Sequence, residues 1–243
     1  IAGLPCTGAS LSGRTKGKLA FAESHSSAGT LFVAFLDFVV ACNPSFFQIE
    51  NVPPYQNTES IKVLRECLDT LGYRLEERVL GGNEFGALED RKRLCFIGVS
   101  KGISFDFTLG NVAPIREKEA VLGDVLESID NESVRWKDLS YLNVKAERDA
   151  AAGKGFKRQL VNADSTKVGT IGAGYAKLRS TEPFVVNPET GLERILTPSE
   201  HAKVKAVNPS LVDGISDTIA HQILGNSVVF SAFQAVYESL GKE

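Results

Sequence analysis

The sequence has no methionine, one tryptophan, three histidines and no closely spaced cysteines among its 243 residues. The cysteines are Cys6, Cys42, Cys67 and Cys95, and the lack of any CxxC pair argues against a zinc ribbon or a disulfide framework. Isolated cysteines are typical of a reducing compartment. No apolar run reaches the roughly 18 residues of a membrane span, and no basic segment followed by an apolar one indicates a signal peptide. We therefore expect an intracellular protein.

The bulk composition is that of a folded protein. Apolar residues make up 43% and charged residues 23% of the chain, which is ordinary for a globular domain and argues against disorder. A chain of this length forms one large domain or two small ones. Residues 132–180 hold ten Lys and Arg against five Asp and Glu, although the whole chain carries a net charge of −3. This basic region indicates a polyanionic partner, or else a solvated face with an excess of cations.

Apolar spacing predicts alternating helices and strands in the first hundred residues. Residues 31–41 are almost continuously apolar and predict a buried helix. Residues 58–71 carry apolar side chains three or four positions apart, which predicts an amphipathic helix that Gly72 ends. Strands are expected at residues 45–49, 73–80 and 94–99. The pattern predicts the second half of an α/β sheet.

This alternation stops near residue 103 and returns near residue 197. The intervening segments are short and punctuated by glycine, which predicts a separately folded insert. Thr197-Pro198-Ser199-Glu200 predicts the start of a helix, because Thr as N-cap, Pro at the first position and Glu at the third form a capping box. A final apolar helix is expected over residues 227–240.

Five short motifs follow one another along the chain. They are Gly3-Leu4-Pro5-Cys6, Gln48-Ile49-Glu50-Asn51-Val52, Glu89-Asp90-Arg91-Lys92-Arg93, Arg194-Ile195-Leu196-Thr197 and Gly225-Asn226-Ser227-Val228. With the basic insert between the third and the fourth, they resemble the motifs of the DNA (cytosine-5)-methyltransferase family. The resemblance implies an α/β fold that is the second half of a Rossmann-like S-adenosylmethionine-dependent methyltransferase domain, with an inserted small, mostly β or irregular target-recognition domain. The implied domains are a partial catalytic domain in residues 1–102, the target-recognition domain in 103–193, and a return to the catalytic domain with a C-terminal helix in 194–243.

The resemblance also implies a catalytic set, Cys6, Glu50, Arg91 and Arg93. In the family a cysteine after proline attacks carbon 6 of cytosine, and a soft thiol suits addition to an aromatic ring and later departure. Glu50 matches the carboxylate that holds a proton at the ring nitrogen. Arg91 and Arg93 suit a pyrimidine carbonyl, a phosphate and Glu50, and their alternation predicts a strand with both on one face. The chain departs from the family at two positions where glutamine is usual, Thr7 and Glu89.

The implied cofactor is S-adenosylmethionine as methyl donor, with no metal. The matching positions are Pro5, Leu31, Asn226, Ser227 and Val228. Leu31 resembles the leucine that lies against the cofactor adenine, and the motif 225–228 opens a helix whose N-terminus suits a carboxylate. The glycine-rich turn and the ribose-binding acid of the family are not found in the sequence. The resemblance therefore implies that the first half of the catalytic domain lies before Ile1 or in a partner subunit.

The implied partner is double-stranded DNA, whose target base has to be flipped out of the duplex. The loop after Cys6 closes over that base in the family, and its candidate DNA contacts are Ser10, Ser12, Arg14 and Lys16. In the basic region, Lys154, Lys157 and Arg158 are expected to neutralise phosphates. The aromatic residues of the insert are expected to form its small core, namely Trp136, Tyr141, Phe156 and Tyr175. Such an activity is cytoplasmic and nucleoid-associated in a prokaryote and belongs to restriction-modification.

Two other functions remain open at this point. A DNA-binding subunit of a split methyltransferase would need a partner chain for the cofactor, although retention of Cys6, Glu50 and Arg91 favours a catalytic chain. An unrelated thiol enzyme would use Cys6 with His25, but the sequence shows no acid or oxyanion donor for it. The start at Ile1 and the lack of methionine are consistent with a fragment or with lost residues.

Overall fold

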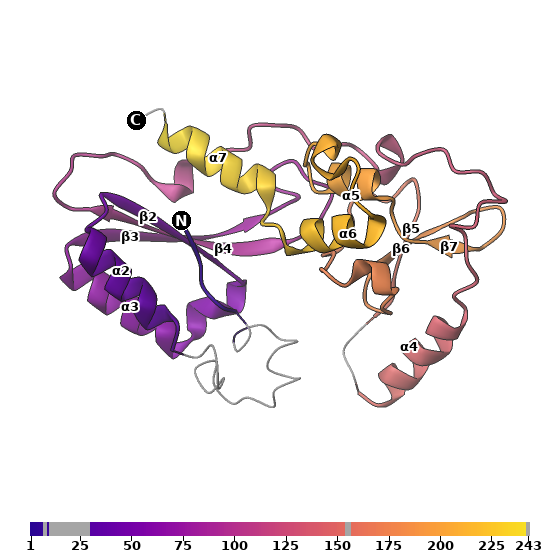
Figure 1. Ribbon diagram of the computed structural model, residues 1–243, viewed down its shortest axis with the longest axis horizontal. Coiled ribbons are helices and arrows are strands. Elements are labelled where there is room, and N and C mark those ends of the chain that lie inside the picture. Colours follow the sequence, from indigo (N-terminus) through magenta and orange to yellow (C-terminus); the bar gives the residue numbers. More distant parts are fainter. Residues whose placement is uncertain (7–8, 10–29, 154–156, 242–243) are drawn as a thin grey trace. The chain divides into compact units, whose positions relative to one another are not determined.

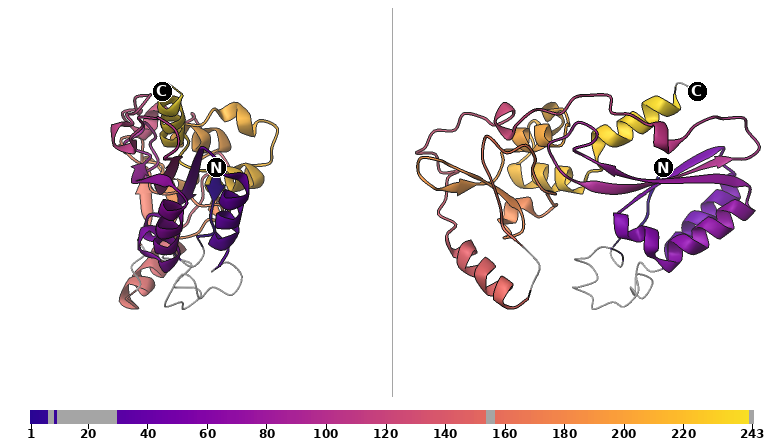
Figure 2. Two further views of the ribbon diagram at one scale, coloured as in Figure 1. Left: turned by 90° about the vertical axis from the view of Figure 1, so that its left-hand side faces the viewer. Right: turned by 180° about the vertical axis from the view of Figure 1, so that it is seen from behind.

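The computed structural model describes residues 1–6, 9, 30–153 and 157–241. It divides into two compact units, the first formed by residues 1–80, 92–113 and 236–243 and the second by residues 81–91 and 114–235. Each unit is a mixture of helices and strands (Figures 1 and 2). Residues 194–235 thus lie in the second unit and residues 236–243 in the first, and the division into domains at residues 1–102, 103–193 and 194–243 stays a prediction.

The first unit is a four-stranded sheet in the order β1-β2-β4-β3. Its strands are β1 (Ala2–Gly3), β2 (Phe46–Asn51), β3 (Tyr73–Gly81) and β4 (Lys92–Ser100). Its helices are α2 (Phe32–Cys42) and α3 (Glu59–Thr70), with the 3-10 turns η2 (Pro53–Asn57) and η3 (Leu109–Asn111). β1 runs parallel to β2, and β2 runs antiparallel to β4. The helices and strands predicted for this part of the chain are all present, with ends that differ by at most two residues.

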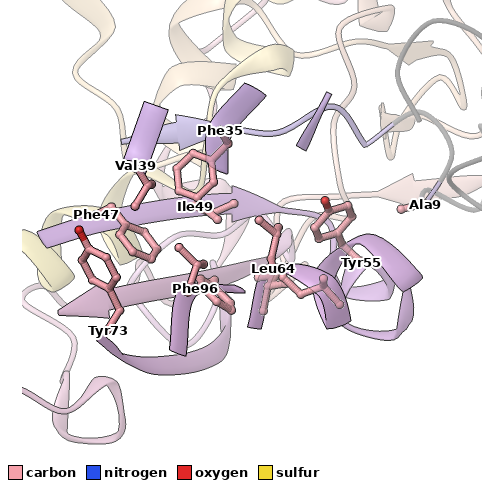
Figure 3. Close-up of a cluster of buried hydrophobic side chains, with 12 residues drawn as sticks. Ala9, Phe35, Val39, Phe47, Ile49, Tyr55, Leu64, Tyr73 and Phe96 are labelled. Carbon is pink, nitrogen blue, oxygen red and sulfur yellow. The ribbon is translucent and has the colours of Figure 1, made fainter. Parts of the chain in front are cut away.

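Alternation along β2 divides its side chains between the two faces of the sheet. Phe47 and Ile49 are buried in the hydrophobic cluster that α2 and α3 form with the sheet (Figure 3). On the opposite face, Gln48 accepts a hydrogen bond from Tyr237 near the end of α7 (Phe230–Leu240). The sheet is therefore covered by helices on both faces within this unit.

α3 forms where the periodicity predicts it. Thr58 caps the helix by accepting the amide of Ile61 at 3.4 Å, and Gly72 follows its end with φ +87°. Leu64 and Leu68 face the sheet and are fully buried. Burying each of these two leucines stabilises the folded chain by about 2–3 kcal/mol. A helix of this length exposed to solvent lacks that stabilisation and is only marginally stable.

The second unit contains a three-stranded sheet in the order β5-β6-β7. Its strands are β5 (Gln159–Val161), β6 (Pro183–Val186) and β7 (Glu193–Arg194). Its helices are α4 (Tyr141–Ala151), α5 (Pro198–Val204), α6 (Asp217–Asn226) and the first part of α7, with the turns η4 (Leu122–Asp124), η5 (Tyr175–Lys177) and η6 (Pro209–Val212). α4 and α6 were not predicted, and the final helix begins three residues later than predicted.

α5 begins with the predicted capping box. The Thr197 hydroxyl accepts the amide of Glu200 at 3.1 Å, and the Glu200 carboxylate accepts the amide of Thr197 at 2.7 Å. The Glu200 carboxylate also accepts hydrogen bonds from Nη1 and Nη2 of Arg194, at 2.6 and 2.7 Å. Leu196 and Val204 then pack in a cluster with Val168, which joins α5 to the strands and turns of this unit. Among the described helices, none has the length and apolar character needed to cross a membrane.

Candidate active site

Two predicted catalytic residues lie at the same edge of the first sheet. β1 and β2 are parallel neighbours, with Ala2 opposite Ile49 and Gly3 opposite Glu50. The carboxyl ends of parallel strands meet at one edge, which is where open α/β sheets bind ligands. Cys6 follows the end of β1 and is half-buried. The register therefore brings the Cys6 turn and the Glu50 end of β2 to the same edge of the sheet.

Arg93 joins this edge from β4. Its Nε lies 2.8 Å from Oε1 of Glu50, and the two side chains are 16% and 21% exposed. Because β2 and β4 are antiparallel, with Glu50 opposite Cys95, Arg93 approaches Glu50 from the neighbouring strand. The pair is neither fully solvated nor fully buried, so a charge-assisted hydrogen bond fixes the carboxylate while part of it stays accessible.

Asn51 links the two strand ends. Its side chain is 1% exposed, and its Nδ2 donates to the carbonyl of Leu4 at 3.2 Å. Its Oδ1 accepts the amide of Val52 at 2.8 Å. Sequence reasoning assigned no role to this asparagine.

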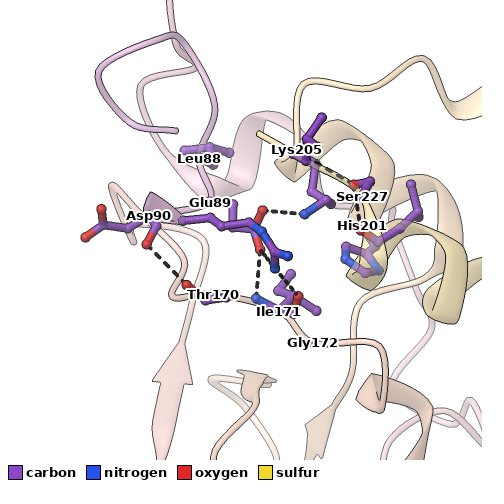
Figure 4. A network of polar contacts seen from close by, with 12 residues as sticks. Leu88, Glu89, Asp90, Thr170, Ile171, Gly172, His201, Lys205 and Ser227 are labelled. Carbon is purple, nitrogen blue, oxygen red and sulfur yellow. Dashed lines mark hydrogen bonds and ion pairs between the residues drawn. The ribbon is translucent and has the colours of Figure 1, made fainter. Parts of the chain in front are cut away.

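Arg91 lies in the second unit, where its sequence neighbours Glu89 and Asp90 lie near Thr170 and Ile171 (Figure 4), and has different surroundings from Arg93. It precedes β4, is 6% exposed, and donates to the carbonyl of Ile171 at 3.3 Å. Its Nη1 is 4.0 Å from the Glu89 carboxylate. The predicted strand with both arginines on one face is therefore not formed, because only Arg93 belongs to β4.

Glu89, one of the two departures from the family pattern, is the centre of a buried polar network in the same unit. Its Oε2 lies 2.5 Å from Nζ of Lys205, whose side chain is 1% exposed, and its Oε1 accepts the amide of Ile171 at 2.8 Å. The network fastens the segment before β4 to α5 and to the loop at residues 170–172. Lys205 gave no sequence signal, since a lysine after a helix is usually solvated.

The Arg158 side chain is buried in an ion pair with Glu193 and is not exposed at the surface. It donates to Glu193 at 3.1 Å, both side chains are less than 10% exposed, and its guanidinium lies 5.4 Å from the ring centroid of Phe184. Lys157 beside it is exposed. Of the two basic residues, Lys157 is the one with the accessibility that a phosphate contact requires.

The residues matched to the cofactor are divided between the two units. Pro5 and Leu31 belong to the first, and both are exposed, Leu31 by 46%. The other three belong to the second unit: Asn226 ends α6, and Ser227 and Val228 lie in the short connection that leads to α7 at Phe230. The Ser227 hydroxyl donates to the carbonyl of Leu224 at 2.7 Å, and Val228 is 38% exposed.

Several predicted residues lie outside the described residues. They are Ser10, Ser12, Arg14, Lys16 and Lys154, together with His25 and Phe156. The three remaining aromatic residues of the insert differ in burial, since Tyr175 is fully buried, Trp136 is half-buried and Tyr141 is 59% exposed.

The second unit contains a buried pair of histidines that the sequence did not predict. Nδ1 of His201 and Nδ1 of His221 are 3.0 Å apart, and the ring of Tyr175 packs edge-on against both. Burial lowers the pKa of His221 to about 4, and burial together with Lys205 lowers the pKa of His201. Two neutral imidazoles can share one hydrogen bond, so the pair is a core contact. Within the described residues, no three His, Cys, Asp or Glu side chains form a group suited to a metal ion.

Comparison with protein families decides the relationship of the chain. The family model for C-5 cytosine-specific DNA methylase matches residues 1–242. The chain belongs to this family. It is 32% identical to the Type II methyltransferase M.NlaX of Neisseria lactamica, over 98% of this chain and 74% of the relative. It is 27% identical to M1.ScrFI of Lactococcus lactis subsp. cremoris, over 99% of this chain but only 61% of the relative. The family and these relatives support an enzyme of the DNA cytosine methyltransferase class.

Solved structures support the fold. The chain superposes on the Entamoeba histolytica methyltransferase EhMeth with a TM-score of 0.74 and 21% identity, covering 99% of this chain and 76% of that one. The S. pombe Dnmt2 methyltransferase gives a TM-score of 0.70 at 19% identity, over 87% of this chain and 71% of that one. The mixed α/β methyltransferase fold predicted from the motifs is thereby confirmed.

Proposed function

We propose that this chain carries the nucleophile of a DNA (cytosine-5)-methyltransferase, which methylates carbon 5 of a flipped cytosine through a covalent Cys6 adduct. The observation that carries the proposal is the edge of the first sheet. Cys6 follows the carboxyl end of β1, Glu50 lies near the carboxyl end of the neighbouring parallel strand β2, and Arg93 lies 2.8 Å from Glu50. A thiol beside a hydrogen-bonded carboxylate is what nucleophilic addition to a cytosine ring needs.

In the proposed reaction, the Cys6 sulfur forms a bond to carbon 6 and the 5,6 double bond opens toward carbon 5. Glu50 holds a proton at ring nitrogen 3, so that negative charge does not accumulate on the pyrimidine. Arg93 fixes Glu50 through Nε, its Nη1 donates to the Lys92 carbonyl at 2.7 Å, and we assign its Nη2 to the pyrimidine carbonyl. After methylation, loss of the carbon 5 proton and departure of Cys6 restore the double bond. Arg91 acts in this scheme by holding the segment before β4 in place.

The family is S-adenosylmethionine-dependent, and the residues matched to that cofactor fit it in part. Leu31 and Val228 each present an exposed aliphatic side chain that an adenine or a methionine chain could cover. The Ser227 hydroxyl is already used by a backbone carbonyl. We propose Pro5, Leu31 and residues 226–228 as the part of the cofactor site that this chain supplies. When bound, the cofactor provides the methyl group that carbon 5 accepts.

Duplex DNA is the proposed substrate, and residues 103–193 are proposed as its target-recognition region. Lys157 is the exposed cation that we assign to phosphate contact, together with Lys154 and the loop residues Ser10, Ser12, Arg14 and Lys16. Extruding the target base costs a few kcal/mol, which such contacts offset. Arg158 supports this region from inside through Glu193.

The test is trapping of the adduct with duplex DNA that contains 5-fluorocytosine, because fluorine at carbon 5 prevents release of Cys6. The full-length gene product is incubated with this DNA, with and without S-adenosylmethionine. We expect a cofactor-dependent covalent complex that Cys6→Ser abolishes and that the matched variant Cys42→Ser, at an exposed cysteine, retains. Glu50→Gln should slow adduct formation with little change in DNA affinity. DNA binding without any adduct would refute the enzyme and support a DNA-binding subunit instead.

A further inference from the structure

The buried side chain of Asn51 occupies a place where an apolar residue would serve the core better. It shares the helix-covered face of β2 with Phe47 and Ile49, and it is 1% exposed. Burying an amide costs free energy unless its hydrogen bonds are made, and even then the net gain in stability is small. Stability alone therefore does not explain an asparagine at this position.

The two hydrogen bonds of Asn51 indicate what it does instead. β1 pairs with β2 only as far as Gly3 opposite Glu50. One residue beyond that pairing, the Leu4 carbonyl receives the Asn51 amide at 3.2 Å. The side chain thus continues the contact between the two strand ends by one step.

Little conformational freedom remains between this contact and the thiol. Pro5 separates Leu4 from Cys6, and its ring fixes φ near −65°. On the other side, the Cys6 carbonyl accepts the amide of Ala9 at 2.9 Å, and Ala9 is buried in the core of this unit. The nucleophile is therefore held before and after by groups that are themselves fixed.

We propose that Asn51 is a positioning residue that sets Cys6 against Glu50. The inference rests on the proposed function. Asn51 adjoins Glu50 along β2 and is hydrogen-bonded to the backbone two residues before Cys6, so one side chain determines the offset between the nucleophile and the acid. A displacement of about 1 Å between reacting groups can lower a rate by about 100-fold.

The experiment compares Asn51→Ala and Asn51→Asp with a matched control, Tyr73→Phe. Asn51→Asp keeps size and the acceptor for the Val52 amide, but it loses the donor to Leu4. Tyr73→Phe also removes one hydrogen bond from a buried side chain to the backbone of this unit, the 2.7 Å bond to the Pro44 carbonyl. That bond lies at the start of β2, at the opposite end from Glu50.

Four measurements are made on each full-length variant. They are the rate of adduct formation on 5-fluorocytosine DNA, the DNA affinity, the midpoint of urea unfolding, and the alkylation rate of Cys6, followed by mass spectrometry of its peptide. We expect both Asn51 variants to form adduct about 10- to 100-fold more slowly, with DNA affinity within about threefold of the parent. Cys6 should be alkylated several-fold faster, because the turn that half-buries it is released. Tyr73→Phe should lower the unfolding midpoint about as much as Asn51→Ala and leave Cys6 unchanged.

Two results would overturn the assignment. One is a normal adduct rate in Asn51→Ala, since that variant lacks the bond to Leu4 and adds no charge to the buried position. The other is an equal loss of adduct rate in Tyr73→Phe, which would make the effect one of general stability. If the parent protein forms no adduct at all, the proposed function fails, whereas the comparison of Cys6 alkylation still decides whether Asn51 holds the thiol. Should Asn51→Ala not fold, Asn51→Leu, which is similar in size, uncharged and unable to donate to Leu4, supplies the same comparison.

Discussion

The buried pair of Glu89 and Lys205 allows a quantitative test of the second unit. Glu89→Gln removes the carboxylate charge without changing the size of the side chain, and Lys205→Met removes the opposite charge. The atoms are 2.5 Å apart and the side chains are 3% and 1% exposed. At that separation, with an effective dielectric constant of about 20, two unit charges attract by about 7 kcal/mol.

The net effect is smaller, because forming the pair also removed two charges from water. Breaking a buried pair by removing one partner destabilises a protein by about 3–5 kcal/mol. We expect Glu89→Gln at the lower end, about 3 kcal/mol, because the amide oxygen still accepts the Ile171 amide that Glu89 holds at 2.8 Å. Lys205→Met should cost a similar amount, and Arg91, 4.0 Å from Glu89, moderates that loss.

The double variant shows whether the two charges interact or whether each side chain stabilises the unit independently. If the charges interact, Glu89→Gln with Lys205→Met destabilises by about 2 kcal/mol less than the sum of the single variants. Trp136 is the only tryptophan of the chain and belongs to the second unit, so its fluorescence during urea unfolding reports on that unit. Lys167→Met is the matched control, since Lys167 pairs with Asp90 at 3.3 Å while 63% exposed, and should cost under about 1 kcal/mol. Additive effects, with a coupling below about 0.5 kcal/mol, would refute the reasoning.

Three further predictions follow from the same structure. Burial keeps His201 and His221 neutral in the folded chain, so the unfolded chain binds protons first as the pH falls below 6.5. The free energy of unfolding should therefore decrease between pH 6.5 and pH 4, and His221 should account for about 3 kcal/mol of this loss. In the same fluorescence assay, His221→Phe should lose much less stability over this pH range. Thr197→Ala removes the cap of α5 and should lower the unfolding free energy by about 1 kcal/mol, and an unchanged urea midpoint would argue against a working capping box. Burial raises the pKa of Cys95 to about 12, so at pH 8 it should resist iodoacetamide until the chain unfolds while the exposed Cys42 reacts, a difference that peptide mass spectrometry detects.

The sequence predicts elements well where burial has a clear period. α3 was predicted within one residue at each end because Leu64 and Leu68 repeat at helical spacing between a capping threonine and a glycine. α4 carries a single buried residue, Leu142, so no apolar period marks it. α6 exposes Ile219 and Ile223 while burying Ala220 and His221, a pattern that hides its buried face. Tertiary packing, rather than local pattern, determines these helices.

The same limit applies to the candidate site. Cys6, Glu50 and Arg93 were assigned from the family resemblance and stay predictions as catalytic residues, while the sheet places Glu50 and Arg93 2.8 Å apart on neighbouring strands. Arg158 could not be distinguished from an exposed cation, because its partner Glu193 lies 35 positions away and nothing local indicates the pairing. Lys205 and Glu89 are 116 positions apart, and their pairing is equally invisible in the sequence.

The two arginines of one motif show why a short pattern does not fix the role of each residue. Alternation places two side chains on one face only while both belong to the same strand. β4 begins at Lys92, between Arg91 and Arg93, so the alternation has no meaning across that boundary. Arg91 is consequently held by the Ile171 carbonyl and Glu89, whereas Arg93 alone pairs with Glu50. Substituting Arg93 should therefore affect the chemistry of Glu50 directly, whereas substituting Arg91 should act first through the stability of the second unit.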